Sequence, residues 1–276
     1  VVDDQVGYAY SESFLPEDML AAADAAAAIA PGVNATKISE RKQLQLKRYY
    51  DQDIDWDALE VARAVALLQN IDKKTRATDD EIVQVTVGLT WNQRAIMINT
   101  SDGVNASDNQ PYFSLRLNIV MKHGDETQSN GANTAALDSF DALTDAKIDA
   151  LIDEAVADTK ILFQSVKPKG GELPVVLGAG ASGILLHEAI GHGLEADFNR
   201  KEQSIFATKL NQKVASPEVT IYDSGCFDNS RGALDVDDEG TIGQHTVLVQ
   251  NGILTSYLHD KISARHYGVA PTGNGR

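Results

Sequence analysis

The stretch Ile82-Val-Gln-Val-Thr-Val-Gly-Leu-Thr90 alternates apolar and polar side chains, with Val83, Val85, Val87 and Leu89 in alternate positions. Successive side chains of a strand point to opposite faces, so this alternation predicts a strand with one buried face. Further strands are predicted over residues 94–99, 112–121 and near 125–132, because apolar and β-branched side chains recur there. Together these segments predict an antiparallel sheet.

Helices are expected before and after these strands in the sequence. Residues 57–75 carry apolar side chains about every 3.6 positions, with Asp55 or Asp57 as the N-terminal cap. Residues 145–165 carry an apolar stripe of Ile148, Leu151, Ile152, Ala155 and Leu162. Nearer the start, residues 7–11 are expected to form a strand and residues 16–30 a helix with Pro16 in its first turn.

The last hundred residues follow a linker at 167–171 and are expected to be rich in strands. The apolar run 173–177 predicts a buried strand, residues 219–222 predict another, and Asn251-Gly252 predicts a hairpin between residues 246–250 and 253–257. The whole chain is therefore expected to be α+β: an antiparallel sheet with helices, followed by a β-rich domain that carries a metal-binding helix.

That helix is predicted from His187-Glu-Ala-Ile-Gly-His192, in which two imidazoles bracket a carboxylate. In the common zinc-protease pattern the histidines are four apart, so both reach one metal ion while the Glu between them serves as general base. Here they are five apart, which on an ideal helix would place them ~140° from each other. A one-residue π-bulge would remove the conflict, and Gly191 is the position where we expect the backbone to tolerate it best.

Two other patterns offer alternative interpretations. Gly178, Gly180 and Gly183 match the spacing of a dinucleotide-binding fingerprint between a strand and a helix. The next convincing strand comes only at Val219, later than a compact unit of ~30 residues requires, so close packing of strand and helix is the favoured interpretation. Asp235, Asp237 and Glu239 imitate the start of a calcium loop, but Thr246 stands where a bidentate Glu is needed. We expect a solvated acidic loop instead.

Composition narrows the function classes. The chain has 276 residues, a hydrophobic content of 43%, one cysteine and a net charge of −16. The charge disfavours direct binding of nucleic acid, and no apolar run approaches the ~20 residues that span a bilayer. With no secretory signal and no possible intramolecular disulfide, a soluble cytoplasmic protein is expected.

Three segments resemble a known family. Residues 186–200, residues 237–241 (Asp-Asp-Glu-Gly-Thr) and residues 268–276 (Gly-Val-Ala-Pro-Thr-Gly-Asn-Gly-Arg) are similar to the metalloprotease subunit of the TldD/TldE (PmbA) family, and residues 6–13 match more loosely. The resemblance implies that His187 and His192 are zinc ligands and that Glu188 is the general base. It also implies a third ligand, a cysteine nearer the C-terminus of family members. This chain is therefore expected to be a fragment lacking both ends, with its third ligand beyond residue 276.

Within the chain, Cys226, Glu195, Asp197, His245, His259 and His266 are also chemically able to bind zinc. The resemblance divides the chain into a remnant of an N-terminal domain (1–35), a middle α+β domain (36–168) and the start of a C-terminal metalloprotease domain (169–276). It implies a zinc-dependent metallopeptidase, incomplete in this fragment, that acts on unfolded or extended peptides and works with a TldE/PmbA-like sister subunit. Backbone pairing of such peptides with the hairpin at 247–254 is one expected binding mode. The alternatives are a non-catalytic partner subunit of the TldE/PmbA type and a dinucleotide-binding enzyme.

Overall fold

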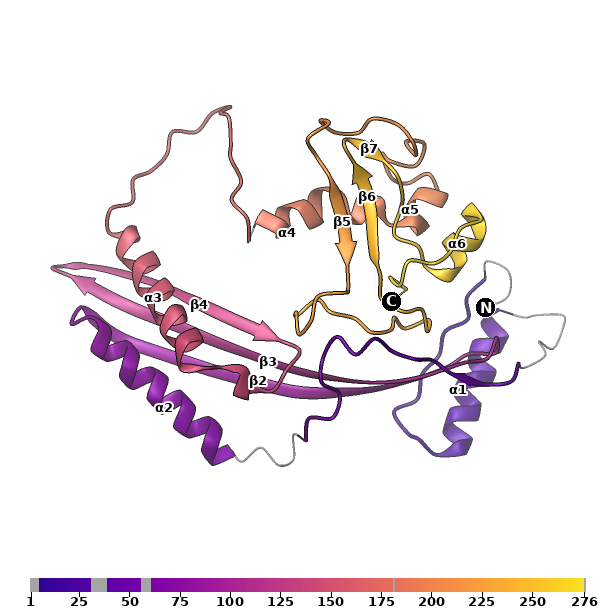
Figure 1. The fold of residues 1–276 in the computed structure, drawn as a ribbon, viewed down its shortest axis with the longest axis horizontal. Helices are drawn as coiled ribbons and strands as arrows, with labels where there is room; N and C mark the ends of the chain where they lie inside the picture. The colour runs from indigo at the N-terminus through magenta and orange to yellow at the C-terminus, as the bar shows by residue number, and fades with distance from the viewer. Residues whose placement is uncertain (1–4, 31–38, 56–60, 181, 276) are drawn as a thin grey trace.

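The computed structural model describes residues 5–30, 39–55, 61–180 and 182–275. The central sheet is built from β2 (Ile82–Asn99), β3 (Val104–His123) and β4 (Glu126–Ala136), paired antiparallel in chain order, with the short β1 (Lys42–Gln43) parallel to the start of β3. Figure 1 shows β2 and β3 as one long hairpin that extends well beyond helices α2 (Val61–Thr78) and α3 (Asp145–Leu162). The predicted antiparallel sheet and the α+β class are confirmed.

Helices α2 (Val61–Thr78) and α3 (Asp145–Leu162) pack on this sheet and enclose the first core. Thr144 caps α3 by accepting a hydrogen bond from the Lys147 N–H. The predicted stripe of α3 faces inward, with Ile148, Leu151, Ile152 and Ala155 all buried. The predicted helix at 57–75 corresponds to α2, and its expected start falls among residues outside the described ranges. Helix α1 (Pro16–Ile29) begins at Pro16 as predicted.

Leu117 lies at the centre of this first core and is fully buried on β3, between Val87 of β2 and Ala132 of β4. We expect Leu117→Ala to lower the free energy of unfolding by ~2–5 kcal/mol, because it leaves a cavity among packed side chains. Chemical denaturation measures the change. The matched control Asn118→Ala alters an exposed neighbour on the other face of the strand and should change the free energy by no more than ~0.5 kcal/mol. Equal effects of the two substitutions would contradict this placement of the core.

The second part of the chain forms a three-stranded sheet of β5 (Ile221–Ser224), β6 (His245–Gln250) and β7 (Ile253–Leu254). The predicted hairpin is confirmed: Asn251 and Gly252 have φ of 49° and 80°, the left-handed conformation that a tight two-residue turn requires. Around this sheet lie α4 (Ser182–Leu186), η2 (His187–Gly191), η3 (His192–Leu194), α5 (Ala196–Arg200) and α6 (Lys261–Tyr267). Its core contains Leu194, Ala196, Leu248, Val249, Leu254 and Tyr257.

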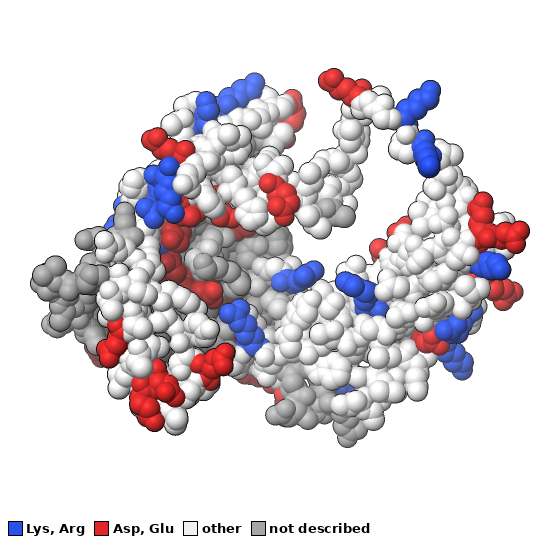
Figure 2. All heavy atoms as spheres, turned by 180° about the vertical axis from the view of Figure 1, so that it is seen from behind, with Lys and Arg blue, Asp and Glu red and all other residues white. Residues whose placement is uncertain are grey.

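Two predicted strands are wrong. Residues 173–177 form no strand and are exposed, and Val176 is 96% accessible. Residues 7–11 also form no strand. A strand needs a neighbouring edge to satisfy its backbone groups, and none of the described strands pairs with either segment. Figure 2, seen from behind, shows the molecule hollowed beneath the arch that residues 163–180 form. Among the described residues, no helix has both the length and the apolar character needed to cross a bilayer.

Candidate metal site

The helix that carries the histidine motif has three different windings in succession between Ser182 and Leu194. Residues Ser182–Leu186 are α-helical, His187–Gly191 form a π-turn, and His192–Leu194 form a 3-10 turn. In the π-turn the His192 N–H donates to the His187 carbonyl, five residues back. The predicted departure from α-geometry is thereby confirmed. Gly191 has ordinary helical angles (φ −54°, ψ −56°), so the bulge does not depend on the special freedom of glycine.

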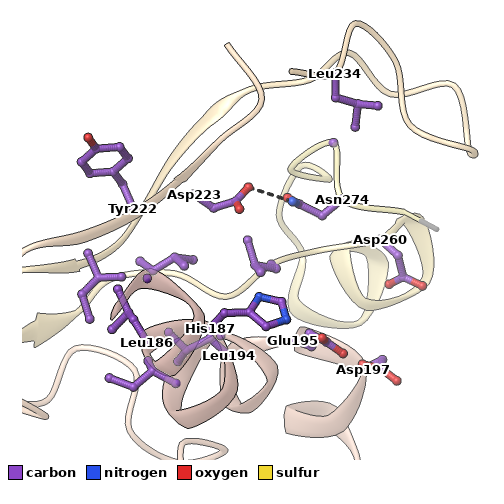
Figure 3. A pocket seen from close by; sticks show the side chains of 17 residues that line it. Leu186, His187, Leu194, Glu195, Asp197, Tyr222, Asp223, Leu234, Asp260 and Asn274 are labelled. Carbon is purple, nitrogen blue, oxygen red and sulfur yellow. Dashed lines mark hydrogen bonds between the residues drawn. The ribbon is translucent and has the colours of Figure 1, made fainter. Parts of the chain in front are cut away.

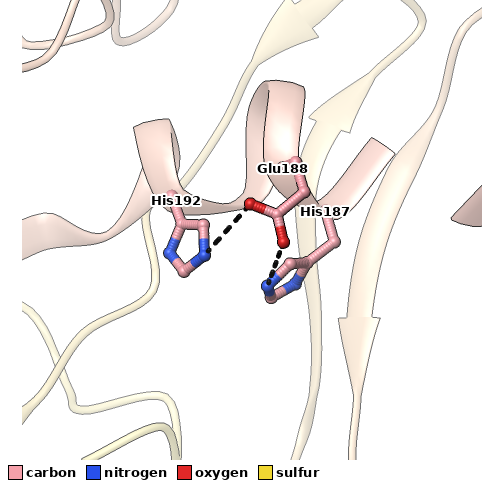
Figure 4. A group of neighbouring side chains, drawn as sticks. All are labelled: His187, Glu188 and His192. Atoms are coloured by element: carbon pink, nitrogen blue, oxygen red, sulfur yellow. Dashed lines mark ion pairs between the residues drawn. The ribbon is translucent and has the colours of Figure 1, made fainter. Parts of the chain in front are cut away.

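The π-turn brings both imidazoles to one side of the helix. The ring centroids of His187 and His192 are 4.6 Å apart, and one ligand atom from each of His187, Glu188 and His192 lies within 4.8 Å of the others. Figure 4 shows the Glu188 carboxylate between the two rings. Its oxygens lie 4.0 Å from His187 Nε2 and 3.8 Å from His192 Nε2. Two imidazole nitrogens and a carboxylate, all exposed, are a donor set that suits a zinc-like divalent ion.

Glu195 fixes the orientation of the second ring. Its Oε1 lies 2.7 Å from His192 Nδ1, which leaves Nε2 directed toward Glu188. Side chains three positions apart overlap in a 3-10 turn, so the tight winding after His192 makes this contact possible. A carboxylate on the other nitrogen of a metal-binding imidazole selects the tautomer and raises its basicity. Glu195 therefore occupies the place of an orienting group rather than a ligand.

Buried groups hold the end of this helix in place. Leu194 is fully buried in the second core, and the Asn199 side-chain amide donates to the carbonyls of Gly193 and Glu195 at 2.9 and 2.7 Å. The Ser204 hydroxyl donates to the same Gly193 carbonyl. The last carbonyls of a helix lack partners within it, and here side chains supply them. The short helix thus has a defined end although it is only partly buried.

The other potential ligands lie outside the cluster. Among the described residues, no further His, Cys, Asp or Glu joins His187, Glu188 and His192 within bonding reach of one ion. The Cys226 thiol lies 3.7 Å from the Gly243 carbonyl, and the His245 ring contacts Tyr222. His259 is buried, which lowers the pKa of its imidazole, and its Nδ1 has no hydrogen-bond partner among the described residues. The His266 ring makes an edge-to-face contact with Tyr267, and Asp197 lies 3.8 Å from Lys201.

A cavity of about 630 Å³ adjoins the cluster between the π-turn and β5. His187 projects into it, and Figure 3 shows the apolar side chains of Leu186 and Leu194 on one side and the carboxylates of Glu195, Asp197 and Asp260 on the other. Opposite His187, Asp223 of β5 accepts a hydrogen bond of 2.9 Å from the Asn274 amide. Sequence reasoning did not single out Asp223 or Asn274 as site residues. The only signal was the place of Asn274 in the Pro-Thr-Gly-Asn-Gly-Arg segment.

The acidic loop that contains Asp235 and Asp237 was predicted to be solvated, and this prediction is wrong. Asp235 and Asp237 are fully buried, and the Asp237 carboxylate accepts hydrogen bonds from the backbone N–H groups of Glu239, Thr241 and Gly275. These bonds compensate the carboxylate for lost hydration. They also tie the loop to residues 273–275, two of which line the cavity. Burial raises the pKa of the neighbouring Glu239.

The glycine-rich segment lacks the context of a dinucleotide site. Residues 163–177, directly before Gly178, contain no strand, and α4 is only five residues long. The dinucleotide fingerprint needs a strand that leads directly into a long helix, whose N-terminus binds the pyrophosphate. The nucleotide interpretation is therefore not favoured.

Two models of known protein domains match this chain. Residues 54–163 match the model of the PmbA/TldA metallopeptidase central domain, and residues 170–276 match that of the PmbA/TldA metallopeptidase C-terminal domain. A TldD metalloprotease homologue of Haemophilus influenzae is 39% identical over 80% of this chain and 47% of its own length. One from Buchnera aphidicola (Acyrthosiphon pisum) is 35% identical over 99% of this chain and 58% of its own length.

A solved structure shares the fold. TldE from Thermococcus kodakarensis superposes with a TM-score of 0.71 at 23% identity, over 99% of this chain and 62% of that one. The chain belongs to the PmbA/TldD family of metalloproteases. It spans about half the length of the curated relatives that it matches.

Proposed function

We propose that this chain carries the two histidine ligands and the general base of a zinc peptidase that cleaves unfolded or extended peptides. The observation that carries the proposal is the π-turn. It brings His187, Glu188 and His192 within 4.8 Å of one another, although their spacing forbids this in a regular helix. The family relationship to proteins named metalloproteases supports the same reading.

Each side chain has a distinct role in this proposal. His187 and His192 would hold the ion, and Glu195 contacts the His192 ring through its Nδ1. A zinc ion held there would polarise the scissile carbonyl and lower the pKa of the attacking water. Glu188 accepts the proton of that water and passes it to the leaving amine, since its carboxylate lies beside both rings.

The cluster supplies two of the three protein ligands that catalytic zinc sites use. Since no other ligating side chain of the described residues joins it, we propose that the third ligand lies outside these 276 residues. The family resemblance points to a cysteine there. The same resemblance suggests a TldE/PmbA-like sister subunit as partner. The three site residues argue against a non-catalytic role for this chain. With a single cysteine, a cytoplasmic location suits it.

The strand edge that could receive a peptide lies elsewhere than the hairpin expected from the sequence. Strand β6 is the middle strand of its sheet, and β7 already pairs with Gln212 and Asn211 through backbone bonds of Leu254. The hairpin at 247–254 therefore offers no free edge. Among the described strands, β5 pairs with β6 alone, and its residues Ile221, Tyr222 and Asp223 line the cavity beside His187. We propose β5 as the edge that an extended peptide joins.

Metal analysis of the purified full-length protein tests the proposal. We expect bound zinc in stoichiometric amount and hydrolysis of an unstructured peptide, lost on chelation and restored by zinc. A protein that binds no divalent metal, or one whose peptide cleavage resists a chelator, would contradict it.

Glu195→Gln tests the orienting role of that residue. The amide can still contact Nδ1 but carries no charge, so we expect zinc affinity to fall by ~10–100-fold while the fold is retained. A competition titration with a chromophoric chelator measures the affinity. Asp197→Asn is the control, because Asp197 lines the same cavity but does not contact His192. A similar loss in both variants would indicate a general effect of negative charge instead.

A further inference from the structure

A short segment before α2 joins the two halves of the molecule. The Tyr49 N–H and the Gln52 side-chain amide donate to the two carboxylate oxygens of Asp235, at 3.2 and 2.8 Å. The Asn229 N–H donates to the Tyr49 carbonyl at 2.8 Å. Residues 49–52 lie outside both matched family domains, whereas Asp235 and Asn229 belong to the C-terminal one. The segment therefore bridges to the metal-site domain through backbone and side-chain bonds.

Tyr50 completes the bridge on the side of the central sheet. Its side chain is buried, and its hydroxyl donates to Asp108 Oδ2 of β3 at 2.7 Å while accepting the Asp235 N–H at 3.4 Å. The Gln110 side chain donates to the same Asp108 oxygen at 2.8 Å. The other oxygen, Oδ1, is buried and has no hydrogen-bond partner among the described residues. One hydroxyl thus connects the buried Asp108 carboxyl group of the central sheet to the backbone N–H of Asp235 in the C-terminal domain.

The surroundings of Asp108 disfavour its charged form. Burial raises the pKa of Asp108, and the nearby Asp235 carboxylate adds to this, whereas the hydrogen bonds from Tyr50 and Gln110 and the charge of Arg94 on β2 oppose it. Burial also raises the pKa of Tyr50, which therefore stays a donor. Ionisation of Asp108 places a second negative charge beside Asp235 where little water can screen it.

We propose that Tyr50, Asp108 and Asp235 form a protonation-dependent joint between the central sheet and the metal-site domain, closed while Asp108 holds its proton and loosened when it ionises. A carboxyl group that binds its proton more tightly in the closed state stabilises that state fully at low pH. The stabilisation is lost as the pH rises through the raised pKa.

The joint is connected to the candidate site through the residue next to Asp235 in the chain. Leu234, the residue before Asp235, lines the cavity beside His187, and its N–H donates to the Gly225 carbonyl. Displacement of Asp235 therefore shifts one wall of the cavity. This last step rests on the proposed peptidase function, whereas the joint itself does not.

Hydrogen exchange in the full-length protein tests the joint without any activity measurement. After correction for intrinsic rates, we expect the amides of residues 229–237 to exchange several-fold faster at pH 8 than at pH 5 in the wild type. Asp108→Asn mimics the protonated carboxyl and should exchange slowly at both pH values. Tyr50→Phe removes the connecting hydroxyl and should exchange fast at both.

Asp125→Asn is the matched control, since Asp125 is exposed in the turn between β3 and β4 and should keep the wild-type profile. Exchange independent of pH in the wild type, or an equal pH dependence in Asp108→Asn, would overturn the proposal. If Asp108→Asn does not fold, the exchange rates of the wild type and of Tyr50→Phe still test the proposal. Peptide cleavage that is absent at every pH, with the exchange pattern as expected, would refute the proposed function and leave the joint standing.

Discussion

Glu188→Gln is expected to reduce peptide hydrolysis by ~10²–10⁴-fold while zinc content stays nearly unchanged. The amide keeps the shape of the carboxylate that lies between His187 and His192. It cannot accept a proton from the attacking water, so the variant separates proton transfer from metal binding. Initial rates on an unstructured peptide, together with metal analysis of the same preparation, give both quantities.

Glu172→Gln is the control for this substitution, because Glu172 is exposed and lies outside the cavity. It should retain wild-type rates and metal content. Activity of Glu188→Gln within a few-fold of the wild type would show that another group accepts the proton. Loss of zinc together with activity would instead identify Glu188 as a ligand.

The parts of the fold that were predicted correctly depend on local patterns. Alternation from Ile82 to Thr90 identified β2, but the strand continues to Asn99 as a single element. Two strands were expected, over residues 82–90 and 94–99, yet residues 84–99 pair with β3 without a shift in register. The run at 173–177 has the composition of a strand and lacks a partner edge. Composition indicates the propensity of a segment to form a strand, whereas the strand forms only where a neighbouring strand can pair with it.

In the candidate site, too, features set by local sequence could be predicted, and features set by distant residues could not. The five-residue spacing of His187 and His192 conflicts with α-helical geometry, so the π-turn could be predicted from the sequence alone. The contact of Glu195 with His192 depends on the 3-10 turn that follows, which no pattern indicated. Burial of Asp235 depends on Tyr49 and Gln52, more than 180 positions earlier in the chain. A dense run of acidic residues gave no sign of such distant partners.

His187→Ala is expected to abolish both zinc binding and peptide hydrolysis. The variant leaves a single imidazole, His192, beside Glu188, so even with the proposed third ligand the ion has fewer than the three protein ligands that catalytic zinc sites use. The two imidazoles lie on the surface, with side chains 61% and 52% exposed, so removing one costs little packing. The thermal unfolding of the metal-free protein should therefore change little.

Two controls separate loss of the site from general effects of substitution. His123→Ala removes an exposed imidazole at the far end of β3, where it contacts Glu81, and should leave zinc content and activity intact. Cys226→Ser should also leave both intact, since the thiol lies against the Gly243 carbonyl and outside the metal cluster of the described residues. If His187→Ala kept its zinc and Cys226→Ser lost it, the metal would have to be bound by a different set of ligands. The π-turn would then need another explanation, because its clearest consequence is to bring two imidazoles five residues apart onto one side of a helix.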